Sequence, residues 1–234
     1  MNWYDSSMAC LDVAKQFINE IDTLSHESIK NKNLENRIMI LSKNCLENCR
    51  SPLDYAAYYV FMSYCSRYYD QSKIVNKKIY FPIRADENEF NEYMERNFKN
   101  LKTNRHDIFD IFKNCQLFSG EGWLNNLSLI INANKHITIQ DMPRNQFFKI
   151  NKGHIGGAIF TNSTIELPPS GIPLMVNGSV IDITSPSPYH NLVDAEIKHK
   201  YYFSNLDSPV ILVLTDICNG TYKLISELKH AIDS

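Results

Sequence analysis

Apolar residues recur every three or four positions through the first half of the chain, which is the spacing of one buried helix face. Between residues 5 and 24 the set with this spacing is Cys10, Val13, Ala14, Phe17, Ile18, Ile21 and Leu24. From about residue 34 to 69 it continues with Leu34, Ile38, Leu41, Cys45, Cys49, Leu53, Ala56 and Val60. Pro52 interrupts this second segment, so either the helix kinks there or Ser51 caps a new helix that has Pro52 at its first position.

Three shorter segments continue the helical pattern. The stretch ADENEFNEYMERNF, residues 85 to 98, opens with acidic side chains and closes with Arg96, as the helix dipole favours. RHDIFDIFKNCQLF follows, with Ile108, Ile111, Phe112 and Cys115 inward, and then SGEGWLNNLSLIINANKH, with Trp123, Leu124, Leu127, Ile130 and Ile131 on its apolar side. Residues 1 to 136 are therefore predicted to form a helical bundle.

The pattern changes after His136. Short β-branched or aromatic runs, separated by turn signals, follow one another: HITI, QFFKI, GGAIF, STIEL, SVIDIT and AEIKHKYYF. Asn177-Gly178 between apolar flanks predicts a hairpin. Near the end, Asp207 or Ser208 is expected to cap a helix that begins at Pro209 and covers one sheet face, although VILVL alone also fits a strand. The prediction is an α+β fold, in which residues 137 to 234 form an antiparallel β region with a C-terminal helix.

Composition narrows the classes of function. Twenty-four Lys and Arg against twenty-six Asp and Glu give a formal net charge of -2, so no general attraction to nucleic acid or anionic lipid is expected. Six scattered cysteines indicate reduced thiols, with no metal site and no cofactor. The longest apolar run is shorter than the ~20 residues that a membrane-spanning helix needs. We therefore expect a soluble, cytoplasmic protein that makes no membrane contact.

Arg50 and Asp54 are the first candidates for chemistry, because residues four apart on a helix can touch. One reading is an intrahelical ion pair. The other is a functional pair, since Arg before Asp is the less favourable order for helix stability. The pattern leaves both readings open.

Asn132 and His136 are the second candidates, on the polar side of the predicted fifth helix. At ~100° per residue they fall within ~40° of Asn125 and of each other. This stripe is either a solvated face or a site, in which His136 gives or accepts a proton while Lys135 and Arg50 hold an anion. The common motifs for phosphate loops, dinucleotides, serine hydrolases and zinc proteases are absent.

Four stretches carry a family resemblance: RSPLDY, YFPIRADENEF, GWLNNLSLIINANKH, and IKHKYYF followed by SPVILVL. Together they resemble a family of uncharacterised bacterial proteins with a helical N-terminal part and a β-rich C-terminal part. The helical part is similar to HEPN domains (higher eukaryotes and prokaryotes nucleotide-binding), whose ribonuclease members carry Arg, four to six residues, then His. Arg50 stands at the arginine position. Tyr55 stands where the histidine is expected, and a phenol transfers protons poorly at neutral pH.

Two functions are compatible with this resemblance. The first is a non-enzymatic binding or accessory module, of a kind found in phage-defence or toxin-type systems, that engages a partner protein or forms a homodimer through its helical half. The second is a divergent HEPN-like ribonuclease acting on RNA. In it Arg50 stabilises the phosphate, His136 is the acid or base and Asp54 orients Arg50. The ligand-binding residues expected in either case are Lys135, Asn132 and Tyr55.

Overall fold

The computed structural model confirms the α+β class. It describes residues 2–27, 32–74, 77–136, 144–167, 174–176, 178–181, 190–203 and 206–234. By their contacts these residues form two units. The helical unit comprises Met1–Glu20, Met39–Ile139 and Ile211–Ser234, and the β unit comprises Ile21–Ile38 and Gln140–Val210.

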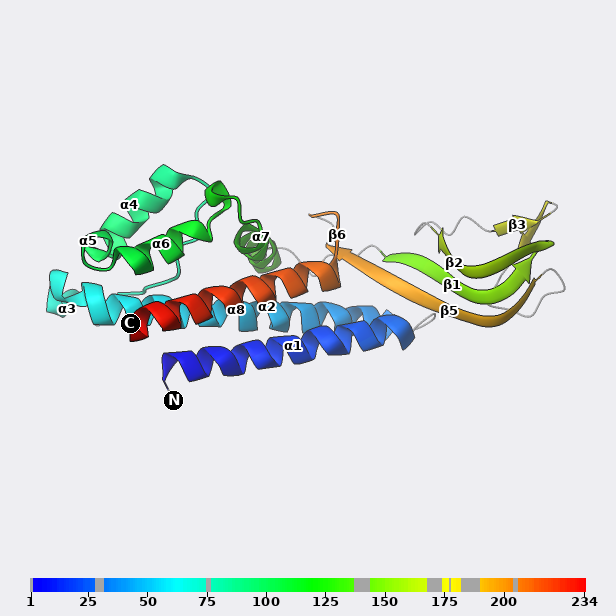
Figure 1. Cartoon of the computed structure of the whole chain (residues 1–234), viewed down its shortest axis with the longest axis horizontal. Coiled ribbons are helices and arrows are strands. Elements are labelled where there is room, and N and C mark those ends of the chain that lie inside the picture. The colour runs from blue at the N-terminus through cyan, green and yellow to red at the C-terminus, as the bar shows by residue number, and fades with distance from the viewer. Residues whose placement is uncertain are drawn as a thin grey trace. The chain divides into compact units, whose positions relative to one another are not determined.

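The longest helices are α1 (Trp3–Glu27), α2 (Lys32–Val60) and α8 (Val210–Asp233). The base of the helical unit consists of α1 up to Glu20, α2 from Met39 onward, and α8 from Ile211 onward. Within this unit they lie alongside one another (Figure 1). The Trp3 ring stacks on Tyr59 at 5.5 Å, and Cys45 Sγ donates to the Ala14 carbonyl oxygen at 3.6 Å, so α1 runs antiparallel to α2. The Lys15 ammonium lies 4.9 Å from the Tyr222 ring centre, which places α8 beside α1 as well.

Pro52 lies inside α2, which continues without a break to Val60. The Ser51 hydroxyl donates back to the Glu47 carbonyl oxygen at 2.9 Å and does not cap a new helix. Of the two readings left open by the sequence, the structure therefore shows a single helix through the proline. Beyond it come a π-helical turn η1 (Phe61–Cys65), a 3-10 turn η2 (Ser66–Tyr68) and α3 (Gln71–Ile74).

The remaining helices are short and pack through aromatic rings. They are α4 (Glu87–Asn97), α5 (Leu101–Asn104), α6 (His106–Asn114), the 3-10 turn η3 (Leu117–Ser119) and α7 (Trp123–His136). The Asp86 side chain caps α4 by accepting from the backbone N–H groups of the residues two and three positions on. Phe112 of α6 packs against both ends of the α4 region. Its ring centre lies 4.7 Å from that of Phe81, which precedes α4, and 5.6 Å from that of Phe98, which follows it.

The β unit holds an antiparallel sheet of order β2-β1-β5-β6. Its strands are β1 (Arg144–Ile155), β2 (Ala158–Leu167), β5 (His190–Phe203) and β6 (Ser208–Pro209). Gly156 and Gly157 form the β1–β2 turn with φ of 57° and 89°, conformations that glycine adopts without steric cost. A separate hairpin pairs β3 (Leu174–Val176) with β4 (Ser179–Ile181), with Gly178 at φ 79° in the turn. It was predicted from Asn177-Gly178; Asn177 and residues 137–139 of HITI lie outside the described residues.

Helix α8 differs in two ways from the sequence prediction. It begins at Val210 and not at Pro209, because Pro209 pairs with Tyr202 in the short strand β6. Its residues from Ile211 onward also belong to the helical unit, whereas the sequence division at residue 136 placed this helix with the β region. The physical reason is its apolar face, which is buried over many turns and matches the length of α1 and α2.

The helices of the described segments include none that is both long and apolar enough to cross a bilayer. All six cysteines are free thiols, and every one except Cys10 is buried.

Candidate functional site

Arg50 and Asp54 form a two-pronged ion pair on α2. Arg50 Nε donates to Asp54 Oδ2 at 3.1 Å and Arg50 Nη2 donates to Asp54 Oδ1 at 2.9 Å. The pair also holds the extended segment before α4, because the Phe81 N–H donates to Asp54 Oδ1 at 2.8 Å and the Phe81 carbonyl accepts from Arg50 Nη2 at 3.4 Å. Both partners are about three-quarters buried, with side-chain exposures of 20% and 24%. The ion pair therefore attaches residues 80–84 to α2 as well as bordering a cavity.

That cavity has a volume of about 580 Å³ and lies between α2, the 80–84 segment, α4 and α7. Its polar lining is Glu47, Arg50, Asp54, Tyr80, Arg84, Tyr93, Ser128 and Asn132. Apolar side chains of the same helices and segment complete the wall, among them Ile83 and Leu127. The cavity thus joins the two stretches of sequence that carried the candidate residues.

Arg84 and Tyr93 are members of this cavity that the sequence did not single out. The Arg84 guanidinium carbon lies 4.4 Å from the centre of the Tyr93 ring, a cation–π contact. The Tyr93 hydroxyl donates to the Tyr80 carbonyl at 3.0 Å, and Arg84 Nη1 donates to the Ile83 carbonyl at 2.6 Å. No carboxylate of the described residues forms an ion pair with Arg84.

Gln116 holds the same segment from the other side. Its Oε1 accepts from the Arg84 backbone N–H at 2.9 Å, and its Nε2 donates to the Pro82 carbonyl at 2.9 Å and to the Phe112 carbonyl at 2.8 Å. The residue is fully buried, where an unpaired amide would be costly. The Arg84 backbone is therefore fixed by the core, and its side chain is positioned at the cavity.

Burial raises the pKa of the Tyr93 phenol, while the neighbouring Arg84 and Arg50 guanidinium groups act in the opposite direction. The pKa of Tyr93 is raised overall, so its side chain remains a neutral hydroxyl at physiological pH. It therefore supplies an aromatic face and a hydrogen-bond donor, not a base.

The residues proposed from sequence divide into three groups. Arg50, Asp54 and Asn132 meet around the one cavity, where Asn132 Nδ2 donates to Ser128 Oγ at 3.3 Å. Tyr55 is 42% exposed and is not part of this cavity lining. Lys135 and His136 complete the last turn of α7, but their side chains lie outside the described residues.

The described residues contain no cluster of three or more His, Cys, Asp or Glu side chains that could hold a metal ion. Comparison with family models, with curated proteins and with solved structures finds no match to this chain. The geometry of the site therefore carries the functional argument.

Proposed function

We propose that this chain is a non-enzymatic binding module whose helical unit takes up an anionic group in the cavity beside Arg84. The observation that carries the proposal is the difference between the two arginines. Arg50 has its carboxylate partner in Asp54, while Arg84 has none among the described residues. Arg84 is also oriented in advance by Tyr93 and by the Ile83 carbonyl.

The chemistry of Arg84 favours a phosphate or carboxylate group. A guanidinium has five N–H donors in a planar fork that fits two oxygens of such a group at once. Only Nη1 of Arg84 has an acceptor within the part of the chain that the structure describes. Ser128 and Asn132, which line the same cavity, add neutral hydrogen-bonding groups for the rest of the ligand.

Binding is favoured over catalysis because Arg50 and Asp54 are already engaged. Asp54 accepts from two nitrogens of Arg50 and from the Phe81 N–H, so its lone pairs are largely occupied. A general base must instead be free to take a proton from its substrate. The pair thus supports the shape of the cavity.

Titration of the full chain tests the proposal, with adenosine monophosphate as the phosphate probe and glutarate as the carboxylate probe. Calorimetry should show saturable binding of one probe, weakened about tenfold or more by Arg84→Gln because a charge-assisted contact is lost. Arg67→Gln is the matched control, since Arg67 also stacks on a tyrosine, at 5.6 Å, but does not line the cavity. If the parent, Arg84→Gln and Arg67→Gln all release the same heat on titration with the probes, or if none releases heat, there is no anion site at Arg84.

A divergent HEPN-like ribonuclease is the second candidate. One observation favours it: Asn132 lines the cavity, and His136 lies one helical turn further along α7, so both residues are on the same side of that helix. In this proposal Arg50 stabilises the phosphate, Asp54 orients Arg50 and His136 transfers the proton. Labelled RNA should then be cut by the parent and not by His136→Ala, with His154→Ala as the control. Cleavage by both histidine variants at the parental rate removes His136 from the mechanism.

The cellular setting we propose is a cytoplasmic defence or toxin-type system of bacteria, with a partner protein or a second copy of the helical unit bound. Its support is the resemblance of the four sequence stretches to proteins of HEPN layout. Size-exclusion chromatography with light scattering, run on the purified chain, tests the homodimer.

A further inference from the structure

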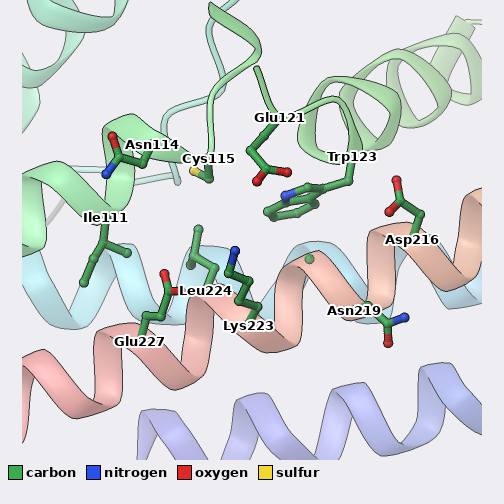
Figure 2. Close-up of a pocket in the computed structure, with 11 residues that line it drawn as sticks. Ile111, Asn114, Cys115, Glu121, Trp123, Asp216, Asn219, Lys223, Leu224 and Glu227 are labelled. Carbon is green, nitrogen blue, oxygen red and sulfur yellow. The ribbon is translucent and has the colours of Figure 1, made fainter. Parts of the chain in front are cut away.

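A second cavity of about 410 Å³ lies in the helical unit, on the other side of α7 from Asn132, between the end of α6, the turn before α7 and one face of α8. Its walls are shown in Figure 2, where Lys223 of α8 points toward Glu121 and Trp123, while Glu227 lies nearer Ile111 and Asp216 lies on the other side of Trp123. None of its lining residues belongs to the Arg84 cavity.

Trp123 supplies a hydrogen-bond donor that faces this cavity. Its side chain is only 5% exposed and lines the cavity at the start of α7. The indole Nε1–H has no hydrogen-bond acceptor among the residues that the structure describes, and Figure 2 shows the nitrogen on the edge of the ring nearest Glu121. The nitrogen is not one of the fully buried polar atoms that lack a partner, so it opens on the cavity, where an atom of a bound ligand can accept from it.

The charged groups of the same cavity are predominantly acidic. Glu121, Asp216 and Glu227 bring three carboxylates, and Lys223 brings one ammonium group. Lys223 is not within ion-pair distance of any carboxylate in the described ranges. The negative potential also reaches Cys115: burial raises the pKa of its thiol, and Glu121 and Glu227 raise it further.

We propose that this cavity binds a basic residue of a partner peptide, with its cationic side chain at the Glu121 and Glu227 carboxylates and its backbone carbonyl accepting from the Trp123 indole N–H. A simple cation would make no use of the indole donor, and an anion would be repelled by the carboxylates. A peptide residue carries both required groups. Arginine fits better than lysine, because its planar fork pairs with carboxylates through two hydrogen bonds.

The test follows the indole N–H of Trp123 by nuclear magnetic resonance in the ¹⁵N-labelled full chain. The chain has two tryptophans, so Trp3 is an internal reference and Trp123→Phe assigns the signal. N-acetyl-arginine methylamide should shift the Trp123 signal saturably and leave Trp3 unchanged. The citrulline analogue, a neutral isostere, should bind about tenfold more weakly or worse. Agmatine, which has the guanidinium without the carbonyl, should bind weakly and shift the indole proton less.

Glu121→Gln should weaken binding of the arginine probe about tenfold. The matched control Glu92→Gln, on the exposed side of α4, should leave that binding unchanged. Glu227→Gln, at the other carboxylate of the proposed site, is the second variant in case Glu121→Gln does not fold, and it should weaken binding of the arginine probe to a similar extent. Thermal unfolding checks each protein. A Trp123 signal that the arginine probe fails to move, or that citrulline moves equally, overturns the proposal. Arg84→Gln should not affect this titration, so the two sites can be tested independently.

Discussion

Gly220 of α8 lies directly against the indole ring of Trp123 of α7. A Cβ atom at position 220 would stand 2.5 Å from Trp123 Cγ and 2.6 Å from Cε2, which are distances that real Cβ atoms do not show. Glycine is normally unfavourable within a helix, by about 1 kcal/mol relative to alanine. Here it permits a close approach of Trp123 to α8, and it forms part of the wall of the acidic cavity.

Gly220→Ala should therefore destabilise the helical unit, against the usual preference of helices for alanine. We expect a loss of about 1 to 3 kcal/mol in the free energy of unfolding, because the indole must move out of its packed position. Urea unfolding followed by circular dichroism gives the value. In a Trp123→Ala background the same substitution should instead stabilise by about 1 kcal/mol. If the sign does not change between the two backgrounds, the contact is not the reason for glycine.

Asp54→Ala should destabilise more than the loss of an ordinary surface ion pair. It leaves Arg50 without its carboxylate and the Phe81 N–H without its acceptor, and we expect a cost of about 2 to 3 kcal/mol. Asp110→Ala is the control, because it breaks a mostly exposed pair with His106 that holds no second segment, and its effect should stay within about 0.5 kcal/mol. Equal effects of the two substitutions in chemical unfolding would show that the Phe81 attachment is unimportant.

Asp107 should contribute a pH-dependent part of the stability. Its hydrogen bonds from Arg105 hold the pKa of the carboxyl below its ordinary value of 3.8. A depressed carboxyl pKa stabilises the fold above the unfolded pKa, and that stabilisation is lost as the pH falls through the folded pKa. Since the Asp107 side chain is 49% exposed, the effect should be below about 1 kcal/mol.

Unfolding at pH 7 and at pH 2.5 tests this expectation with Asp107→Asn. The variant should be less stable than the parent at pH 7, and the difference should shrink as the carboxyl of the parent becomes protonated. Arg105 also donates to the Ala231 carbonyl of α8, so its Asp107 contact helps to orient a link between α6 and α8. A difference that is the same at both pH values would mean that ionisation of Asp107 is not involved.

Cys10 should be the first thiol to react with iodoacetamide at pH 8. It is the one cysteine that is not buried, yet burial still raises its pKa, so its rate should be below that of free cysteine. The other thiols should be protected, and Cys65 is additionally unreactive because burial raises its pKa to about 12. Mass spectrometry should find one adduct in the native protein and six after unfolding. Rapid labelling of several sites without urea would argue against this core.

The spacing of apolar residues was sufficient to locate most helices, because this spacing depends only on residues a few positions apart in the sequence. The segment that opens with Asp86 became α4, and the Asn177-Gly178 signal became the β3–β4 hairpin. Periodicity does not say what covers an apolar face. For this reason the helix from Val210 was predicted correctly as a helix but assigned to the β region, while its contacts belong to the helical unit.

The candidate cavity was predictable only in part. Arg50 and Asp54 are four residues apart, so their contact follows from helix geometry. Their bonds to Phe81 join positions 27 and 31 residues apart in the chain, which no local pattern encodes. Arg84 likewise owes its position to Gln116, whose burial is not evident from the sequence. Tyr55 directly follows Asp54, but one residue turns a helix by ~100°, which takes it to another face.

The discontinuous make-up of the helical unit has a consequence for biosynthesis. As the polypeptide leaves the ribosome, α1, α2 and α7 emerge before the strands of the β unit, which lie in its Gln140–Val210 part, and α8 emerges after them. Until α8 arrives, Cys49 and Trp123 lack the contacts that Cys218 and Gly220 of this helix make with them. The time taken to translate Gln140–Val210 therefore determines how long these helices lack α8, and a nascent chain paused within this segment is the species most in need of chaperone protection.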